Sequence, residues 1–172
     1  MQPSFHERFV ELYNANFPRL FRALDRLSGD AALAADLAQE AFVRLYRRGE
    51  TPDDPGAWLI TVALNLLRNA KSTEARRFRL LSRTRGEATL SDPAPQPEET
   101  LERTDVSARV RAALARLPER DQQLLLLRAE GYRYQELAAA LGLNAASVGV
   151  LLARAKRAFR TVYEERGDTN AS

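Results

Sequence analysis

A stretch near the C-terminal end of the chain carries side chains that suit DNA binding. The apolar spacing after Asn144 predicts a helix. One face of this helix combines small or apolar residues with arginines: Gly149, Val150, Ala153, Arg154, Arg157 and Arg160. Small residues let a helix approach base edges closely, and arginines bind phosphates and guanine. An ordinary amphipathic helix with a solvated basic side is the alternative.

The residues before this helix favour DNA binding. Tyr134 to Leu141 predicts a short helix, and Gly142 can adopt the positive φ that ends one. Asn144 can cap the next helix with its side-chain oxygen. A short helix, a tight turn and a longer helix form a helix-turn-helix pattern. The opposite face of the longer helix is apolar and should face the core: Val148, Leu151, Leu152, Ala155, Phe159 and Val162.

A second candidate surface lies on a helix expected from Gly56 to about Leu81. Its inward residues should be Leu59, Val62, Ala63, Leu66 and Ala70. Its other face carries Trp58, Thr61, Asn65, Arg68, Asn69, Ser72, Arg76 and Arg79. Aromatic rings stack on bases and cations hold the backbone, so this face suits single-stranded nucleic acid. A core position for Trp58 and a role in solubility for the arginines are the alternatives.

A third surface lies on a helix expected from Ala31 to Arg48, capped by Asp30. Its inner face carries Leu33, Ala34, Leu37, Ala41 and Leu45, with Phe42 at the edge. Its outer face carries Asp36, Gln39, Glu40, Val43 and Arg47. An acid/base or metal pair of Asp36 and Glu40 has little support, because no third carboxylate or histidine is nearby. A solvated face and a docking stripe for a basic partner helix both stay open.

The remaining elements are also helical. A first helix from Phe5 to Leu27 is expected to bend or divide at Pro18. Asp54-Pro55 should cap and begin the helix after the loop Gly49 to Pro55. Two further helices are expected, one from Glu102 to Leu117 and one from Glu119 to Glu130. With no strand expected, the fold class is all-α.

Composition and charge divide the 172 residues into two small helical domains joined by a linker. The net charge is only +3, but residues 68–85 hold seven Lys or Arg against one Glu. An acidic, proline-containing stretch follows, and Ser82 to Thr100 should be a flexible linker. Such a basic block next to a linker is typical of a polyanion-binding region. The expected bounds are 1–81 for the first domain, 82–101 for the linker and 102–166 for the second domain.

Several functions lack the residues they would need. The chain has no cysteine, which excludes disulfides and thiolate metal sites. Its one histidine, His6, lies near the start, and no phosphate-binding loop or nucleophile motif occurs, so an enzyme has little support. The first residues contain no apolar run that could form a signal peptide or a membrane span, so we expect a cytoplasmic protein without membrane insertion.

The order of these motifs resembles the sigma-70 family of transcription initiation factors. Asp36 to Phe42 (DLAQEAF) and Ala57 to Asn65 (AWLITVALN) resemble region 2 of that family. Leu117 to Arg120 (LPER), Gly131 to Ala138 (GYRYQELA) and the helix containing Val148 resemble region 4. The short length points to the extracytoplasmic-function (ECF) group. The resemblance covers about residues 8 to 162.

The resemblance implies partners for each surface. Asp36, Gln39, Glu40 and Val43 correspond to the contact with the β′ clamp helices of core RNA polymerase, and the β flap is a further expected contact. The loop 49–55 and the residues Trp58, Thr61, Asn65, Arg68, Asn69, Ser72 and Arg76 correspond to the surface that melts and reads the single-stranded −10 element. Tyr134, Ser147, Gly149, Val150, Ala153, Arg154 and Arg157 correspond to the reader of the duplex −35 element. An anti-sigma factor is a possible partner, and no cofactor or metal is implied.

One stretch departs from the family pattern. Family members usually carry a polar or basic run after the Val148 position, whereas this chain has Gly149, Val150 and Leu151. We therefore expect Val150 and Ala153 to contact thymine methyl groups, with Arg154 and Arg157 on phosphates or guanine. Exposed Val150 is also a candidate contact for an anti-sigma factor.

Two other functions stay open at this point. A stand-alone helix-turn-helix regulator would bind palindromic duplex DNA unaided as a dimer. A helical adaptor would ignore nucleic acid. Neither alternative explains the face from Trp58 to Arg79.

Overall fold

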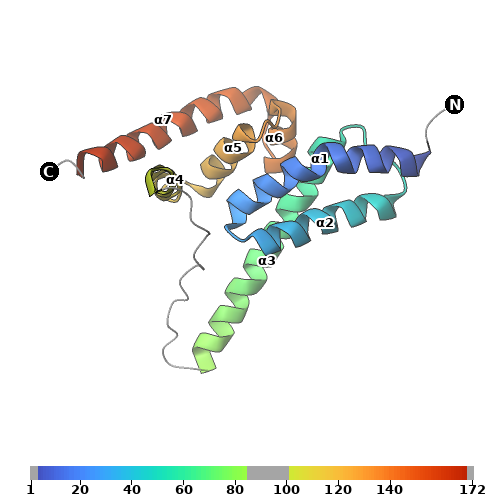
Figure 1. Cartoon of the computed structure of the whole chain (residues 1–172), viewed down its shortest axis with the longest axis horizontal. Coiled ribbons are helices and arrows are strands. Elements are labelled where there is room, and N and C mark those ends of the chain that lie inside the picture. The colour runs from blue at the N-terminus through green and yellow to red at the C-terminus, as the bar shows by residue number, and fades with distance from the viewer. Residues whose placement is uncertain (1–3, 85–100, 170–172) are drawn as a thin grey trace.

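A computed structural model describes residues 4–84 and 101–169 of the chain, without the side chains of 84, 101–104 and 166–169. Within these ranges the secondary structure consists of helices alone, which confirms the all-α prediction. In chain order they are α1 (Phe5–Ser28), α2 (Ala31–Arg48), α3 (Pro55–Thr84), α4 (Leu101–Leu114), α5 (Glu119–Ala129), α6 (Tyr134–Leu141) and α7 (Ala145–Thr169). Figure 1 shows α1 to α3 as one group and α4 to α7 as another, with α6 against the first group.

The predicted helix starts are confirmed by their capping bonds. The Asp30 carboxylate accepts the Leu33 N–H at 3.0 Å, and the Asp54 carboxylate accepts the Ala57 N–H at the same distance. The Asn144 side chain accepts the Ala146 N–H at 3.0 Å. Each bond satisfies a backbone donor that has no partner within its own helix. Gly142 ends α6 with φ +63°, as its position predicts.

Aromatic side chains pack α1 against α2. The Phe42 ring lies 4.9 Å from the Tyr13 ring and 6.0 Å from the Phe17 ring, centroid to centroid. Phe42 is buried at the centre of this cluster, so its predicted place at the edge of the inner face was wrong. Helix α1 runs through Pro18 as one helix, so the predicted division at this proline does not occur.

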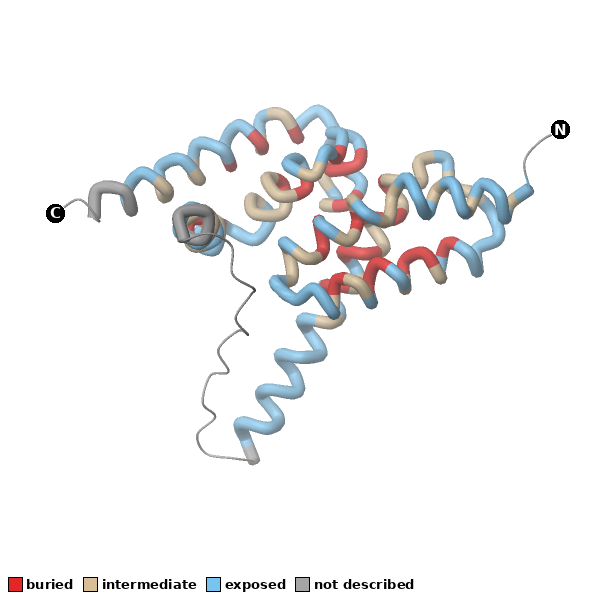
Figure 2. Tube along the Cα trace, in the orientation of Figure 1, coloured by how far each residue is buried: buried red, intermediate tan, exposed pale blue. Residues whose placement is uncertain are grey.

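Two further predicted bounds differ from the structure. Helix α3 continues through Thr84, beyond Leu81, and its second half projects from the body with exposed residues on all sides (Figure 2). Helix α4 ends at Leu114 and not at Leu117, because the chain tightens into a turn: the N–H groups of Arg116 and Leu117 donate to the carbonyls of Ala113 and Leu114, three residues back. The predicted linker lies mostly outside the described residues.

Helix α3 buries two apolar stripes and not one. Leu59 and Ala63 face inward as predicted, while Val62 and Leu66 are half-buried against the core. Ile60, Leu64 and Leu67 are also buried, on a neighbouring stripe that was not predicted to be covered. The partner of this second stripe is the C-terminal group of helices, because α3 packs directly on α6. The buried residues of both groups therefore form one continuous core.

Candidate nucleic-acid interface

The C-terminal candidate surface is open to solvent. Val150 is 65% exposed and Tyr134 46% exposed. The other predicted residues of this face are also exposed, except for half-buried Gly149: Ser147, Ala153, Arg154 and Arg157. We call these seven residues the −35 face. They lie on α6 and α7, the two helices of a helix-turn-helix, the motif that places a helix in the major groove.

The −35 face is continuous from α6 to α7. A side chain at Gly149 would lie 3.5 Å from the Tyr134 ring, so the two residues are neighbours across the turn. The guanidinium of Arg128 lies 5.5 Å from the centre of the same ring, at cation–π distance. On the opposite side of α7, Val148, Leu152 and Ala155 are buried as predicted. This burial fixes which side of α7 points outward.

The candidate single-strand surface on α3 is also accessible. Asn65, Arg68, Asn69, Ser72 and Arg76 are exposed, and with Trp58 and Thr61 they form what we call the −10 face. An Arg68 N–H donates to the Asn65 side-chain oxygen at 3.2 Å, which places a cation beside an amide one helical turn away. This pairing leaves the remaining guanidinium donors of Arg68 available to phosphate.

Two members of the −10 face lie deeper. Trp58 is half-buried and packs against the core, so it has both a core side and an exposed edge. Thr61 is half-buried, and its hydroxyl donates to the Ala57 carbonyl at 2.6 Å. The exposed part of the −10 face therefore begins at Asn65 and continues toward the C-terminal end of α3.

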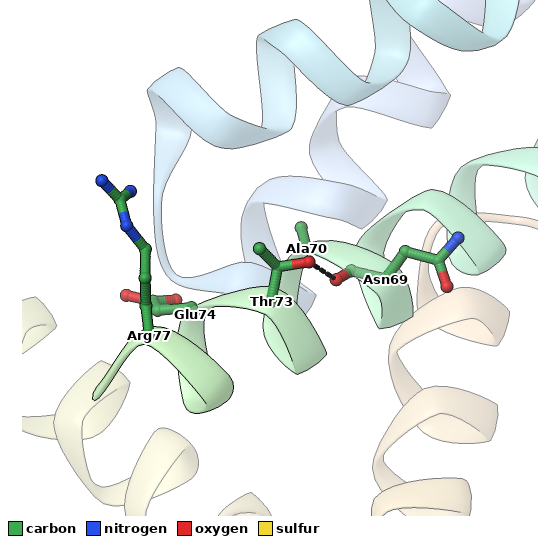
Figure 3. Close-up of a pocket in the computed structure, with 5 residues that line it drawn as sticks. All are labelled: Asn69, Ala70, Thr73, Glu74 and Arg77. Carbon is green, nitrogen blue, oxygen red and sulfur yellow. Dashed lines mark hydrogen bonds between the residues drawn. The ribbon is translucent and has the colours of Figure 1, made fainter. Parts of the chain in front are cut away.

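A shallow hollow on α3 adjoins this face (Figure 3). Its walls are Asn69, Ala70, Thr73, Glu74 and Arg77, and the Thr73 hydroxyl donates to the Asn69 carbonyl at 2.9 Å. All five residues belong to one helix, so the hollow is a groove on the helix surface and not a closed pocket. Such a surface suits an extended polymer better than a small molecule.

The candidate docking stripe on α2 faces outward. Asp36 and Gln39 are exposed, whereas Glu40 and Val43 are half-buried. The Glu40 carboxylate pairs with Arg44 at 2.9 Å, one turn further along the helix. The outer face of α2 therefore combines two carboxylates, Asp36 and Glu40, and the apolar Val43 with the exposed Arg44 and Arg47 toward its C-terminal end. Among the described residues, no group of three or more acidic, histidine or cysteine side chains is placed to hold a metal ion.

Sequence reasoning missed a set of ion pairs between the two groups of helices. Glu136 is only 2% exposed, and its carboxylate accepts from Arg19 at 3.1 Å and from the Arg133 backbone N–H at 2.7 Å. Glu130 binds two arginines of α1, Arg22 and Arg26, at 2.9 and 3.0 Å. One signal was available, since Glu136 interrupts an otherwise apolar helix face.

No single helix in the described ranges is both long enough and apolar enough to cross a bilayer. Together, α6 and α7 pass a test of length and composition, but they meet at a bend of 92°. Apolar residues of α6, among them Leu137, are buried against other helices of the protein.

Fold and surfaces together define a two-domain helical protein with a C-terminal helix-turn-helix. Comparison with protein families makes this class specific. Residues 12–77 match the model for sigma-70 region 2, and residues 107–159 match the model for sigma-70 region 4. The chain belongs to the sigma-70 family, in the group of ECF RNA polymerase sigma factors. Membership of this family favours the sigma-factor hypothesis over a stand-alone regulator or an adaptor.

Individual relatives support the same assignment. The chain is 31% identical to the ECF RNA polymerase sigma factor SigL of Mycobacterium tuberculosis, over 92% of this chain and 90% of that protein. It is 32% identical to the probable RNA polymerase sigma factor RfaY of Xanthomonas campestris and 30% identical to SigE of Mycolicibacterium smegmatis. It spans 38% of the length of RfaY and 63% of the length of SigE.

The fold has a counterpart among solved structures. The sigma factor RpoE of Bartonella quintana, in a co-crystal structure with the anti-sigma factor NepR, aligns with a TM-score of 0.67. The alignment covers 92% of this chain and 98% of RpoE, at 20% sequence identity. At that identity the likeness supports the fold of the chain.

Proposed function

We propose that this chain is a dissociable specificity subunit of RNA polymerase that directs initiation at a defined set of promoters. The observation that carries the proposal is the pair of exposed, arginine-bearing faces, one on each sigma-70 region. One helix face with amides and an aromatic ring suits an opened strand, and a helix-turn-helix suits a duplex. A factor with these two faces contacts a promoter at two places.

Each domain has a separate task in this proposal. Residues 1–81 bind the β′ clamp helices through Asp36, Gln39, Glu40 and Val43, and they read the −10 element through the −10 face. Residues 102–166 bind the β flap and read the −35 element through the −35 face, and residues 82–101 connect the domains. The chain catalyses no bond chemistry itself and uses no cofactor, since polymerase supplies the chemistry. It acts in the cytoplasm, where the polymerase is, and an anti-sigma factor is a candidate regulator.

Binding to core polymerase is the first test of this function. Purified chain and core polymerase should co-elute in size-exclusion chromatography, while the chain alone should bind promoter DNA poorly. A chain that binds palindromic duplex DNA strongly as a dimer, without polymerase, would instead be a stand-alone regulator. A chain that binds neither polymerase nor nucleic acid would be an adaptor.

A further inference from the structure

The Tyr134 side chain is shared between the two helices of the helix-turn-helix. Tyr134 is the first residue of α6 and is 46% exposed. A Cβ atom at Gly149 of α7 would lie 3.5 Å from the ring carbon Cε2, in ordinary van der Waals contact. Cε2 is next to the ring carbon that carries the hydroxyl group. The hydroxyl end of the ring therefore lies against α7, the helix that this motif places in the major groove.

The glycine at position 149 leaves the space that the ring occupies. Gly149 lies in the second turn of α7 and has no positive φ, so the backbone itself does not require a glycine. Glycine weakens a helix interior relative to alanine, so its contribution here is space. Gly149 is half-buried although Ser147 and Val150 beside it are exposed, which agrees with a ring lying over it. A side chain longer than that of alanine would compete with the ring for this space.

Arg128 contacts the same ring from a third helix. It lies in the last turn of α5, and its guanidinium carbon is 5.5 Å from the centre of the Tyr134 ring, at cation–π distance. One of its N–H groups donates to the Tyr132 carbonyl at 3.1 Å, which ties the guanidinium to the turn before α6. The position of the Tyr134 ring thus depends on α5 as well as on α6 and α7.

The Tyr134 hydroxyl is available to a ligand. Within the part of the chain that the structure describes, no hydrogen bond engages it. Residues in the first turns of the second helix of a helix-turn-helix contact base edges, and Gly149 has no side chain for such a contact. A phenolic hydroxyl can donate or accept a hydrogen bond, so it suits the polar edge of a base. The neighbouring side chain of Val150 is apolar and cannot form this bond.

We propose that Tyr134 takes the place of an α7 side chain at position 149 and reads the polar edge of one −35 base, with Gly149 and Arg128 as the residues that position its ring. Tyr134 determines specificity at that base, and the two positioning residues act through it. The reading of a base rests on the proposed function, whereas the placement of the ring on α7 does not.

Nuclear magnetic resonance on the free chain tests the placement of the ring. Because Cε2 lies so close to α7, we expect a nuclear Overhauser effect between the ring Hε protons of Tyr134 and the Hα protons of Gly149. The effect should weaken in Arg128→Gln, which removes the cation, and recover at least in part in Arg128→Lys, which keeps one. Arg111→Gln, at an exposed site on α4, is the control. A folded parent chain without the effect overturns the proposal, and a parent-strength effect in Arg128→Gln overturns the role of Arg128.

Binding of the reconstituted holoenzyme to promoters that differ at single −35 positions tests the reading of a base. Tyr134→Phe removes only the hydroxyl group, so we expect it to lose about fivefold of the preference at one position. Gly149→Leu should lose the same preference because its side chain displaces the ring. Gly149→Ala should lose less, since its Cβ only touches the ring. Ala108→Leu adds the same leucine at an exposed site on α4 and is the control.

The pattern of losses decides the outcome. An equal loss on every promoter in Tyr134→Phe would assign the hydroxyl to a phosphate and overturn the proposal, and so would an unchanged preference. A folded Gly149→Leu that keeps the parent preference overturns the role of Gly149. If this variant does not fold, Tyr134→Phe and the Overhauser effect decide. Failure of the parent holoenzyme to bind any promoter would refute the proposed function, and the Overhauser effect would then decide the placement of the ring.

Discussion

Substitutions of Val150 and of Arg157, two turns apart on the −35 face, should weaken DNA binding in two different ways. Val150 is 65% exposed and Arg157 is exposed, so neither Val150→Ser nor Arg157→Ala should change the free energy of unfolding by more than about 0.5 kcal/mol. Differences in DNA binding between these variants can therefore be read as differences in contacts with DNA.

The magnitudes follow from the chemistry of each contact. Loss of the Val150 methyl groups from a thymine methyl removes about 1 kcal/mol of apolar burial, or roughly fivefold in affinity, only where a thymine is present. Loss of one arginine–phosphate contact weakens binding to all sequences alike. It also lowers the slope of log affinity against log salt by about 0.9. Sequence preference should therefore change in Val150→Ser, and salt dependence in Arg157→Ala.

The assay is binding of the reconstituted holoenzyme to promoters that differ at single −35 positions, at several salt concentrations. Lys156→Ala is the control, because Lys156 is exposed on the same helix but lies outside the −35 face. It should lose less affinity than Arg157→Ala. Equal losses on every promoter for Val150→Ser and Arg157→Ala, with an unchanged salt slope in both, would refute the assigned contacts.

Three further predictions test the other surfaces and the stability of the fold. Glu40→Arg should weaken binding to core polymerase at least about tenfold in a pull-down titration, because it reverses the charge of the docking stripe, while the exposed Glu11→Arg should not. Burial raises the pKa of Tyr132 to about 12, so the folded protein keeps this hydroxyl protonated at pH values where the unfolded chain ionises it. The stability that depends on the neutral hydroxyl is therefore complete below pH 10 and is lost as the pH rises from 10 toward 12. Chemical denaturation of Tyr132→Phe should show a shallower loss of stability over that range, and an identical pH profile in both chains would contradict the assignment. Asp30→Ala should lower the free energy of unfolding by about 1 kcal/mol, since it removes the cap of α2, and an unchanged denaturation midpoint would contradict that role.

Local features of the fold were predictable because they depend on neighbours in sequence. The caps Asp30, Asp54 and Asn144 act on residues two or three positions ahead, so their residue types indicate their function. The helix-turn-helix was predictable for the same reason, since Gly142 marks its turn. The accessibility of Asn65 and Arg154 was also predicted, because both lie opposite an apolar face.

Features that depend on distant partners were not predicted. Ile60, Leu64 and Leu67 form a second apolar stripe on α3, and such a stripe indicates a second packing partner without identifying it. Glu136 and Arg19 are 117 positions apart, so no local pattern connects them. The packing of Phe42 among rings of α1 likewise depends on how two helices cross. Tertiary packing decides these positions.

Run-off transcription with purified core polymerase across a promoter library tests the central claim most directly. The account predicts that adding the chain creates new start sites at a subset of promoters that share −10 and −35 sequences. It further predicts that Arg68→Ala and Arg154→Ala each reduce this stimulated transcription while the fold is kept. Absence of any stimulated start site, together with no co-elution of the chain with core polymerase, would contradict it.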